Sequence, residues 1–174
     1  MPTLSELADA HAARFGDYEQ LHFEGRTFTS GELSDLGKRC ATGLLGLGLQ
    51  SGERVLIVLP NGPEVGTIYG ATWRAGGVVT PVLFLLSPAE MAKVVEQGEP
   101  AVAVTSPEFL PVVRQAVEGV ASVRHIVTTG RPRTGWSRSR TCCGTTRSPS
   151  RSRGTRRTSP RSCSRAGPRA RRRA

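Results

Sequence analysis

Apolar positions near the start of the chain recur at the three- and four-residue spacing of amphipathic helices. One stripe runs from Leu4 to Phe15 behind a Thr-x-x-Glu capping box, and a second runs from Leu33 to Leu47 behind another such box. Between the stripes, the turn Glu24-Gly25 separates two short extended runs. These signals predict a helix, a hairpin and a second helix.

Short apolar runs then alternate with segments of helix length. The runs are Val55–Leu59, Gly77–Val82, Ala101–Thr105 and Val123–Thr128. Runs of Val, Ile, Leu and Ala without polar alternation are typical of strands that are buried on both faces of a parallel sheet. Helix start signals stand between them at Asn61-Gly62-Pro63, Ser87-Pro88 and Ser106-Pro107. The pattern predicts an α/β fold with a partial, doubly wound, mostly parallel sheet.

The composition changes abruptly near Gly130. Residues 1–130 hold nine of the 24 Lys and Arg residues and all 14 Asp and Glu residues, a net charge of −5, whereas residues 131–174 carry 15 Arg and no acid. The second segment has no Leu, Ile, Val, Phe, Met or Tyr, so it cannot bury enough apolar surface to offset the entropy of ordering. We therefore expect an α/β portion over residues 1–130 and a disordered, Arg-rich tail over residues 131–174.

The sequence also lacks targeting and membrane signals. Its start has no basic stretch followed by an apolar run, and no stretch of 18 apolar residues is present. We therefore expect a cytoplasmic protein without a transmembrane segment.

Neither cysteines nor histidines form a pattern of metal ligands. Cys40 is expected to be buried on the apolar face of its helix, and the tail cysteines, Cys142, Cys143 and Cys163, lack the Cys-x-x-Cys spacing of a zinc site. All three histidines are expected to be structural. We expect His11 to be half-buried in the first helix, with His22 and His125 within or beside strands.

Ligands of doubly wound sheets bind outside the carboxyl ends of the strands. The corresponding turns are Pro60-Asn61-Gly62, the turn after Pro81, Thr105-Ser106 and Thr128-Thr129-Gly130. None of them combines a nucleophile, a base and an orienting group, so turn and cap chemistry explains them. The glycines between Gly43 and Gly52 end a helix instead of opening one after a strand, which excludes a dinucleotide fingerprint. We assign no catalytic, cofactor-binding or metal-binding residue.

Several separate motifs, in order and at characteristic spacing, resemble the opening of the adenylate-forming enzymes, with acyl-CoA synthetases as the closest branch. They are Arg26 to Leu33, Gly43 to Val55, Leu59 to Glu64, Trp73 to Pro81, Ser87 to Glu90 and the strand Ala101 to Thr105. The resemblance covers roughly residues 5–130. It implies an ATP-dependent ligase of the AMP-binding type that converts a carboxylic acid, fatty acids included, into an acyl-adenylate and then a coenzyme A thioester, with Mg²⁺ on the nucleotide.

The matched motifs belong to the scaffold of that family. Its phosphate loop, acyl pocket, nucleotide contacts and catalytic lysine come later in the sequence. The resemblance therefore implies ATP, Mg²⁺ and CoA for the full-length family, but no cofactor bound by this fragment. We expect this truncated chain to be inactive, and to expose apolar surface around Ile68, Tyr69 and Trp73 and along Leu83–Leu86.

A shift of reading frame near Gly130 explains the tail. If each codon takes the third base of one codon and the first two bases of the next, Ser162 to Ala174 can encode Leu-Leu-Thr-Ser-Gly-Thr-Thr-Gly-Thr-Pro-Lys-Gly. This string has the form of the family's phosphate loop. The same frame turns Arg140 to Thr145 into Asp-Leu-Leu-Arg-Asp. We therefore predict that the tail is frameshifted.

Two alternatives stay open. The tail could act as a nucleic-acid-binding arm through its arginines, although the acidic folded part and the single aromatic residue of the tail, Trp136, disfavour specific recognition. Alternatively, the chain could be a regulatory or docking module that pairs with full-length synthetases.

Overall fold

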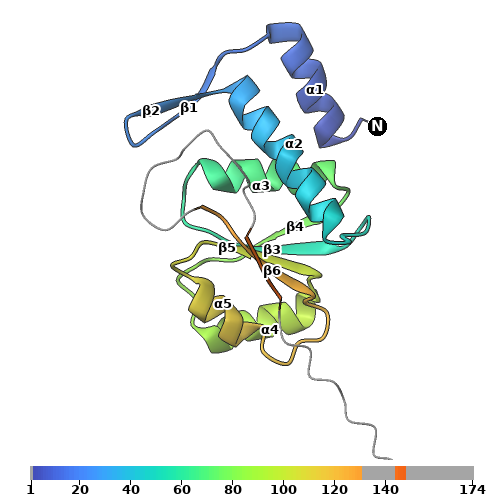
Figure 1. The fold of residues 1–174 in the computed structure, drawn as a ribbon, viewed down its shortest axis with the longest axis vertical. Helices are drawn as coiled ribbons and strands as arrows, with labels where there is room; N and C mark the ends of the chain where they lie inside the picture. Colours follow the sequence, from blue (N-terminus) through green and yellow to red (C-terminus); the bar gives the residue numbers. More distant parts are fainter. Residues whose placement is uncertain (1, 131–143, 148–174) are drawn as a thin grey trace, which may run out of the picture.

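The computed structural model describes residues 2–130 and 144–147 (Figure 1). Its elements in chain order are α1 (Leu4–Phe15), β1 (Glu19–Phe23), β2 (Arg26–Thr29), α2 (Ser30–Gly46), β3 (Arg54–Val58), α3 (Pro63–Arg74), β4 (Val78–Pro81), α4 (Pro88–Gly98), β5 (Val102–Thr105), α5 (Leu110–Ala116), β6 (His125–Thr128) and β7 (Gly144–Arg147). Apart from β7, the predicted disorder of the tail concerns positions outside the described residues.

The strands form a small hairpin and one larger sheet. β1 and β2 pair antiparallel, and the five-stranded sheet has the order β4-β3-β5-β6-β7. β3 runs parallel to β4 and β5, and β5 runs parallel to β6, which confirms the mostly parallel α/β sheet. β7 runs antiparallel along β6. β7 lies in the tail, for which the composition predicts disorder. Strand pairing needs only main-chain N–H and C=O groups, which every residue type except proline supplies in full.

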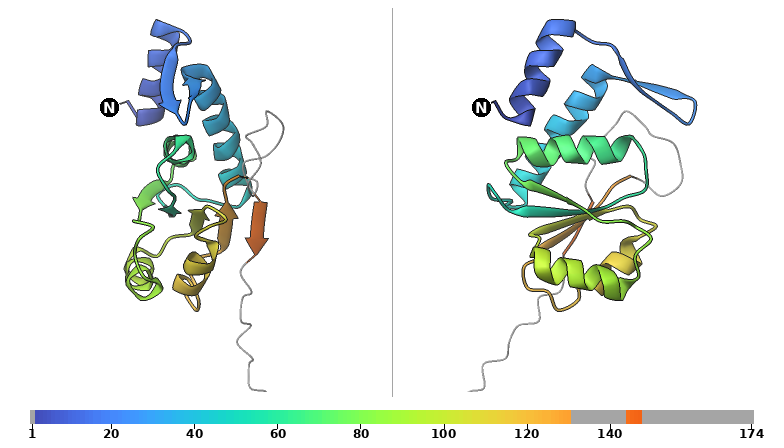
Figure 2. Two further views of the ribbon diagram at one scale, coloured as in Figure 1. Left: turned by 90° about the vertical axis from the view of Figure 1, so that its left-hand side faces the viewer. Right: turned by 180° about the vertical axis from the view of Figure 1, so that it is seen from behind.

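Helices cover both faces of the sheet. Figure 1 shows α2 and α3 on one side and α4 and α5 on the other, and the rear view in Figure 2 shows the same layering. α1 and the β1–β2 hairpin lie beyond α2, away from the sheet (Figure 2). This three-layer arrangement is what a doubly wound sheet requires, since each apolar face needs a helical cover.

The side chains of β3 alternate between two hydrophobic cores. Val55 and Ile57 belong to the core under α2 and α3, whereas Leu56 and Val58 belong to the core under α4 and α5. All four are at most 3% exposed. The continuous apolar run in the sequence therefore supplies both faces of one strand, as predicted.

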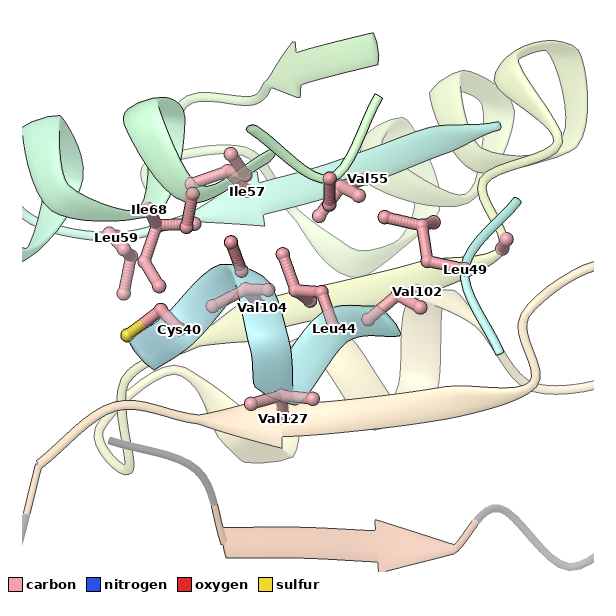
Figure 3. Close-up of a cluster of buried hydrophobic side chains, with 14 residues drawn as sticks. Cys40, Leu44, Leu49, Val55, Ile57, Leu59, Ile68, Val102, Val104 and Val127 are labelled. Carbon is pink, nitrogen blue, oxygen red and sulfur yellow. The ribbon is translucent and has the colours of Figure 1, made fainter. Parts of the chain in front are cut away.

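Figure 3 shows the core under α2 and α3, where helix and strand side chains meet. Leu44 of α2 packs there with Val102 and Val104 of β5 and Val127 of β6. Cys40 lies in the same core and is 2% exposed, so its predicted burial is confirmed.

The helix starts follow the sequence signals in four of the five helices, and α3 begins at Pro63 as predicted. Capping boxes form at Thr3, Thr29 and Ser87, each with the glutamate three residues later. The start predicted at Ser106-Pro107 is wrong. That stretch forms a turn in which the Phe109 N–H donates to the Ser106 carbonyl at 3.2 Å, and α5 begins only at Leu110, directly before a second proline, Pro111.

Two expectations about burial are also wrong. α1 has no buried residue and His11 is exposed, because the described residues place no element over the apolar stripe of this helix. Conversely, Ile68 is 2% exposed because it points into the core under α3. The expected exposure is confirmed for Trp73, at 41%, and for Leu83 and Leu85, at 63% and 75%.

A double glycine joins α3 to β4. Gly76 has φ +77°, and its carbonyl accepts from the Gly52 N–H at 2.8 Å. At Gly77, a Cβ atom would lie 3.1 Å from both Leu49 Cδ2 and Thr72 Cγ2 and 3.3 Å from the Glu53 carbonyl. A Cβ atom at Gly77 would therefore force these neighbours to move by a few tenths of an ångström.

We expect Gly77→Ala to lower the free energy of unfolding by about 1–3 kcal/mol, the range of overpacking in a filled core. The matched control is Gly66→Ala in α3, where a Cβ meets nothing within 4 Å. That change should stabilise the helix by up to about 1 kcal/mol. Urea titration followed by circular dichroism, at low protein concentration, measures both. Equal effects of the two changes would contradict the packing argument.

A bidentate salt bridge joins the amino-terminal ends of two strands. Arg124, before β6, donates from Nη1 and Nη2 to Glu53, before β3, at 2.8 and 2.6 Å, and also to the Gly48 carbonyl at 3.2 Å. Glu53 further accepts from the Gln50 N–H at 2.8 Å. These donors, Arg124 first, lower the pKa of Glu53 from 4.5 to about 2.

Glu53→Gln should lower the free energy of unfolding at neutral pH by about 1 kcal/mol, since solvent screens a pair whose arginine is 41% exposed. A carboxyl with a lowered pKa stabilises the fold above its unfolded pKa and loses this effect as pH falls. The difference between the parent chain and the variant should therefore shrink from about pH 4.5 toward pH 2. Glu96→Gln, an exposed position of α4, is the control and should show no such pH dependence.

Candidate functional site

Ligands of doubly wound sheets bind at the carboxyl ends of the parallel strands. In this chain, most polar groups at these ends form hydrogen bonds within the sheet. The buried Thr105 hydroxyl donates to the Val58 carbonyl at 3.0 Å, and the Thr129 N–H donates to the Thr105 carbonyl at 2.8 Å. Ser106 Oγ is buried without a protein partner among the described residues. One isolated hydroxyl provides neither a base nor an anion cradle.

The turn after β3 has the same structural character. Gly62 precedes α3 in an extended conformation, with φ 174°, and Pro63 opens the helix without a side-chain cap. The prediction of turn chemistry agrees with this geometry, but no side-chain cap forms at α3 or α5. The prediction that the chain holds no catalytic or cofactor-binding residue stays a prediction.

A hollow lies between α1, the β1–β2 hairpin, α2 and α3. It has a volume of about 630 Å³, and its lining includes Gly37, Gly62, Gly66, Gly70, Ala8 and Ala12. These small residues leave room in the hollow, and polar side chains such as Gln20, Ser34 and Asn61 line it as well.

Several polar residues along this groove are paired. Arg74 donates from Nη1 to Asp9 at 3.0 Å and also contacts the second carboxylate oxygen, and this bond lowers the pKa of Asp9. His11 Nδ1 lies 3.4 Å from the Tyr18 hydroxyl, a long contact between exposed groups. The Asp9–Arg74 pair anchors α1 to α3 across 65 positions, so no local sequence signal could have indicated it.

A smaller hollow of about 310 Å³ is lined by Glu96, Glu99 and Glu118 among others. Within the described ranges, no group of three or more His, Cys, Asp or Glu side chains is close enough to hold a metal ion. His22 is exposed and bonds Thr27 at 2.9 Å, while His125 is half-buried in β6. The tail cysteines Cys142, Cys143 and Cys163 lie outside the described residues.

Among the helices that the structure describes, none has both the length and the apolar content of a membrane span.

Comparison with protein families gives a match to the model "AMP-binding enzyme" over residues 8–156. The match continues past Gly130 into the Arg-rich segment. Since 149 of 174 positions lie within residues 8–156, the match covers well over half of the chain.

Individual relatives agree with this match. The chain is 35% identical over 106 residues to 4-coumarate–CoA ligase 5 of Oryza sativa subsp. japonica, and 32% identical over 126 residues to acetyl-coenzyme A synthetase of Streptomyces coelicolor. These alignments cover 61% and 64% of this chain but 19% of each relative.

Solved structures show the same fold. A Rhodopseudomonas palustris protein assigned as a long-chain-fatty-acid CoA ligase superposes with a TM-score of 0.69 and 28% identity, over 74% of this chain and 33% of its own. A benzoate CoA ligase from Burkholderia xenovorans LB400 gives a TM-score of 0.68 at 20% identity, over 75% of this chain and 26% of its own. The chain thus spans between about a fifth and a third of the length of these relatives.

Proposed function

Because this chain belongs to the AMP-binding enzyme family of adenylate-forming acyl-CoA ligases, we propose that it is the N-terminal part of an ATP-dependent carboxylic acid–CoA ligase. The observation that carries the proposal is the agreement of the family match over residues 8–156 with a superposition at 28% identity. A match on fold alone would leave the chemistry open.

The proposed reaction has two steps. A carboxylate oxygen of the acid attacks the α-phosphorus of ATP, which forms the acyl-adenylate and releases pyrophosphate. The thiol of coenzyme A then attacks the acyl carbon, forms the thioester and releases AMP. Mg²⁺ would offset the charge of the phosphates, and the cytoplasm, where ATP and CoA are abundant, is the proposed compartment.

The described part of the chain contributes scaffold to this reaction. Its doubly wound sheet holds two complete cores, but the polar groups at the carboxyl ends of its strands are bonded within the sheet or isolated. No described residue is therefore proposed to touch ATP, the acid or CoA.

We expect the purified 174-residue chain to catalyse no acid-dependent exchange of labelled pyrophosphate into ATP. The assay should include 4-coumarate, acetate, benzoate and a long-chain fatty acid, the acids that correspond to the names of the relatives. A complete ligase of the family serves as the positive control. Exchange above background with any acid would contradict the proposed inactivity of this chain.

A second candidate function, nucleic-acid binding, comes from the 15 arginines of residues 131–174. An evolved RNA-binding arm should prefer particular sequences at physiological salt. Simple charge attraction should bind all RNA alike and weaken steeply as salt rises. We expect the second behaviour in filter binding with several unrelated RNAs, and a sequence preference that survives high salt would favour the arm.

A further inference from the structure

The tail uses a restricted set of amino acids that is defined by the genetic code. All 47 residues from Thr128 to Ala174 are of eight types: Ala, Arg, Cys, Gly, Pro, Ser, Thr and Trp. These eight are the complete set of amino acids whose codons carry C or G at the second position. Residues 1–127, in contrast, contain all twenty types.

A folded protein cannot keep C or G at every second codon position. Leu, Ile, Val, Phe and Met all have T there, and Asp, Glu and Lys all have A, so the restriction removes the main core-forming residues and every acid. The third position, in contrast, can be C or G almost throughout, because most amino acids have a synonymous codon of that kind. The second bases of the tail therefore behave like third bases.

We infer that the codons soon after Val127 are read one base out of phase with the ligase gene, and that the correct phase encodes another strand and then reaches the family's phosphate loop. This inference rests on the proposed function. Since the second base behaves as a third base, each true codon consists of the third base of one codon and the first two of the next. The loss of one base produces this offset, and the insertion of one base restores the phase.

The structure shows how far along the chain the correct reading phase extends. Ile126 and Val127 are 3% and 0% exposed, and β6 stays in register with β5 as far as the pair Thr105 and Thr128. Out-of-phase residues would carry none of the large aliphatic side chains that fill these cores. The phase therefore holds through codon 127 and changes soon afterwards.

In the restored phase, the genetic code requires apolar residues at several positions of the tail. Trp136, Cys142, Cys143 and Cys163 all have codons that begin with TG. Each therefore completes a true codon ending in TG, which encodes only Leu, Met or Val. At Cys143 the preceding base is the last base of a cysteine codon, C or T, so the result can only be Leu. The unexplained cysteines of the tail thus become hydrophobic residues.

The end of the chain gives the loop. In the restored phase, codons 159–164 can encode Ala-Ala-Leu-Leu-Leu, and codons 164–174 can continue with Thr-Ser-Gly-Thr-Thr-Gly-Thr-Pro-Lys-Gly. A short apolar run is typical of a buried strand, and the outer edge of β6 pairs with another strand in this structure. A loop with several glycines, hydroxyls and a lysine exposes N–H groups and positive charge to an anion. The string has the form of the family's phosphate loop, so its ligand in the proposed function is ATP.

The family match reaches residue 156, which lies after the proposed change of phase. Residues 131–156 contain none of Leu, Ile, Val, Phe and Met, on which the burial of the sheet depends. The alignments with the rice, Streptomyces, Rhodopseudomonas and Burkholderia proteins each cover at most 75% of the chain, an extent that residues 1–130 can accommodate.

The nucleotide sequence is the first test. We expect the concentration of C and G to move from the third to the second codon position soon after codon 127, and one inserted base to open a frame through the loop and beyond. The tail contains no Lys, Asn, Asp or Glu, so TAA and TGA cannot occur in the restored phase and only TAG can interrupt it. Third positions that stay rich in C and G through codon 174, or an interrupting TAG, would overturn the inference.

The second test uses the gene with one base inserted, expressed as the full-length product. It should bind ATP, measured by calorimetry, and replacement of the lysine encoded across codons 172 and 173 by methionine should weaken binding about tenfold or more. Glu96→Gln is the control and should bind as the parent does. An open frame whose product ignores ATP would overturn the phosphate site. ATP binding without pyrophosphate exchange would support the inference and contradict the proposed function.

Discussion

The fold depends on one constraint, the burial of β3 and β5 on both faces at once. A parallel strand in the middle of a sheet has no side on which polar residues reach water, so its whole length must be apolar. Val55 and Ile57 face one core and Leu56 and Val58 face the other, and the strand pairs with neighbours on both edges. The helices follow from this, because each face needs its own cover. The close contact at Gly77 then brings α3 directly back to β4.

The sequence predicted the parts of this structure that depend on local chemistry. Capping boxes gave the starts of α1, α2 and α4, and continuous apolar runs gave the four parallel strands. The position of α5 was missed because two prolines, Pro107 and Pro111, both resemble a helix start, and only the second one opens the helix. Periodicity shows which face of a helix is apolar but not whether another element covers it, which explains the errors at His11 and Ile68.

The candidate site illustrates the same limit in another way. Long-range pairs such as Asp9 with Arg74 have no signature in the sequence, and the groove beside them is defined by small residues from four elements. The described residues form a complete scaffold, with two filled cores, around strand ends that offer no converging reactive groups. The family assignment therefore comes from the order of scaffold motifs and from the fold, and we propose that the chemistry belongs to sequence outside the described residues.

The bond between Glu53 and Arg124 has a consequence for synthesis on the ribosome. Its two residues are 71 positions apart, and β4, β3 and β5 can already pair before Arg124 emerges. The central strands of the nascent sheet can thus pair first, and the bond that ties β3 to the segment before β6 forms afterwards. Arg124 also lies upstream of the point at which the composition changes. A ribosome that reads the remainder in any phase has therefore already delivered both residues of this bond.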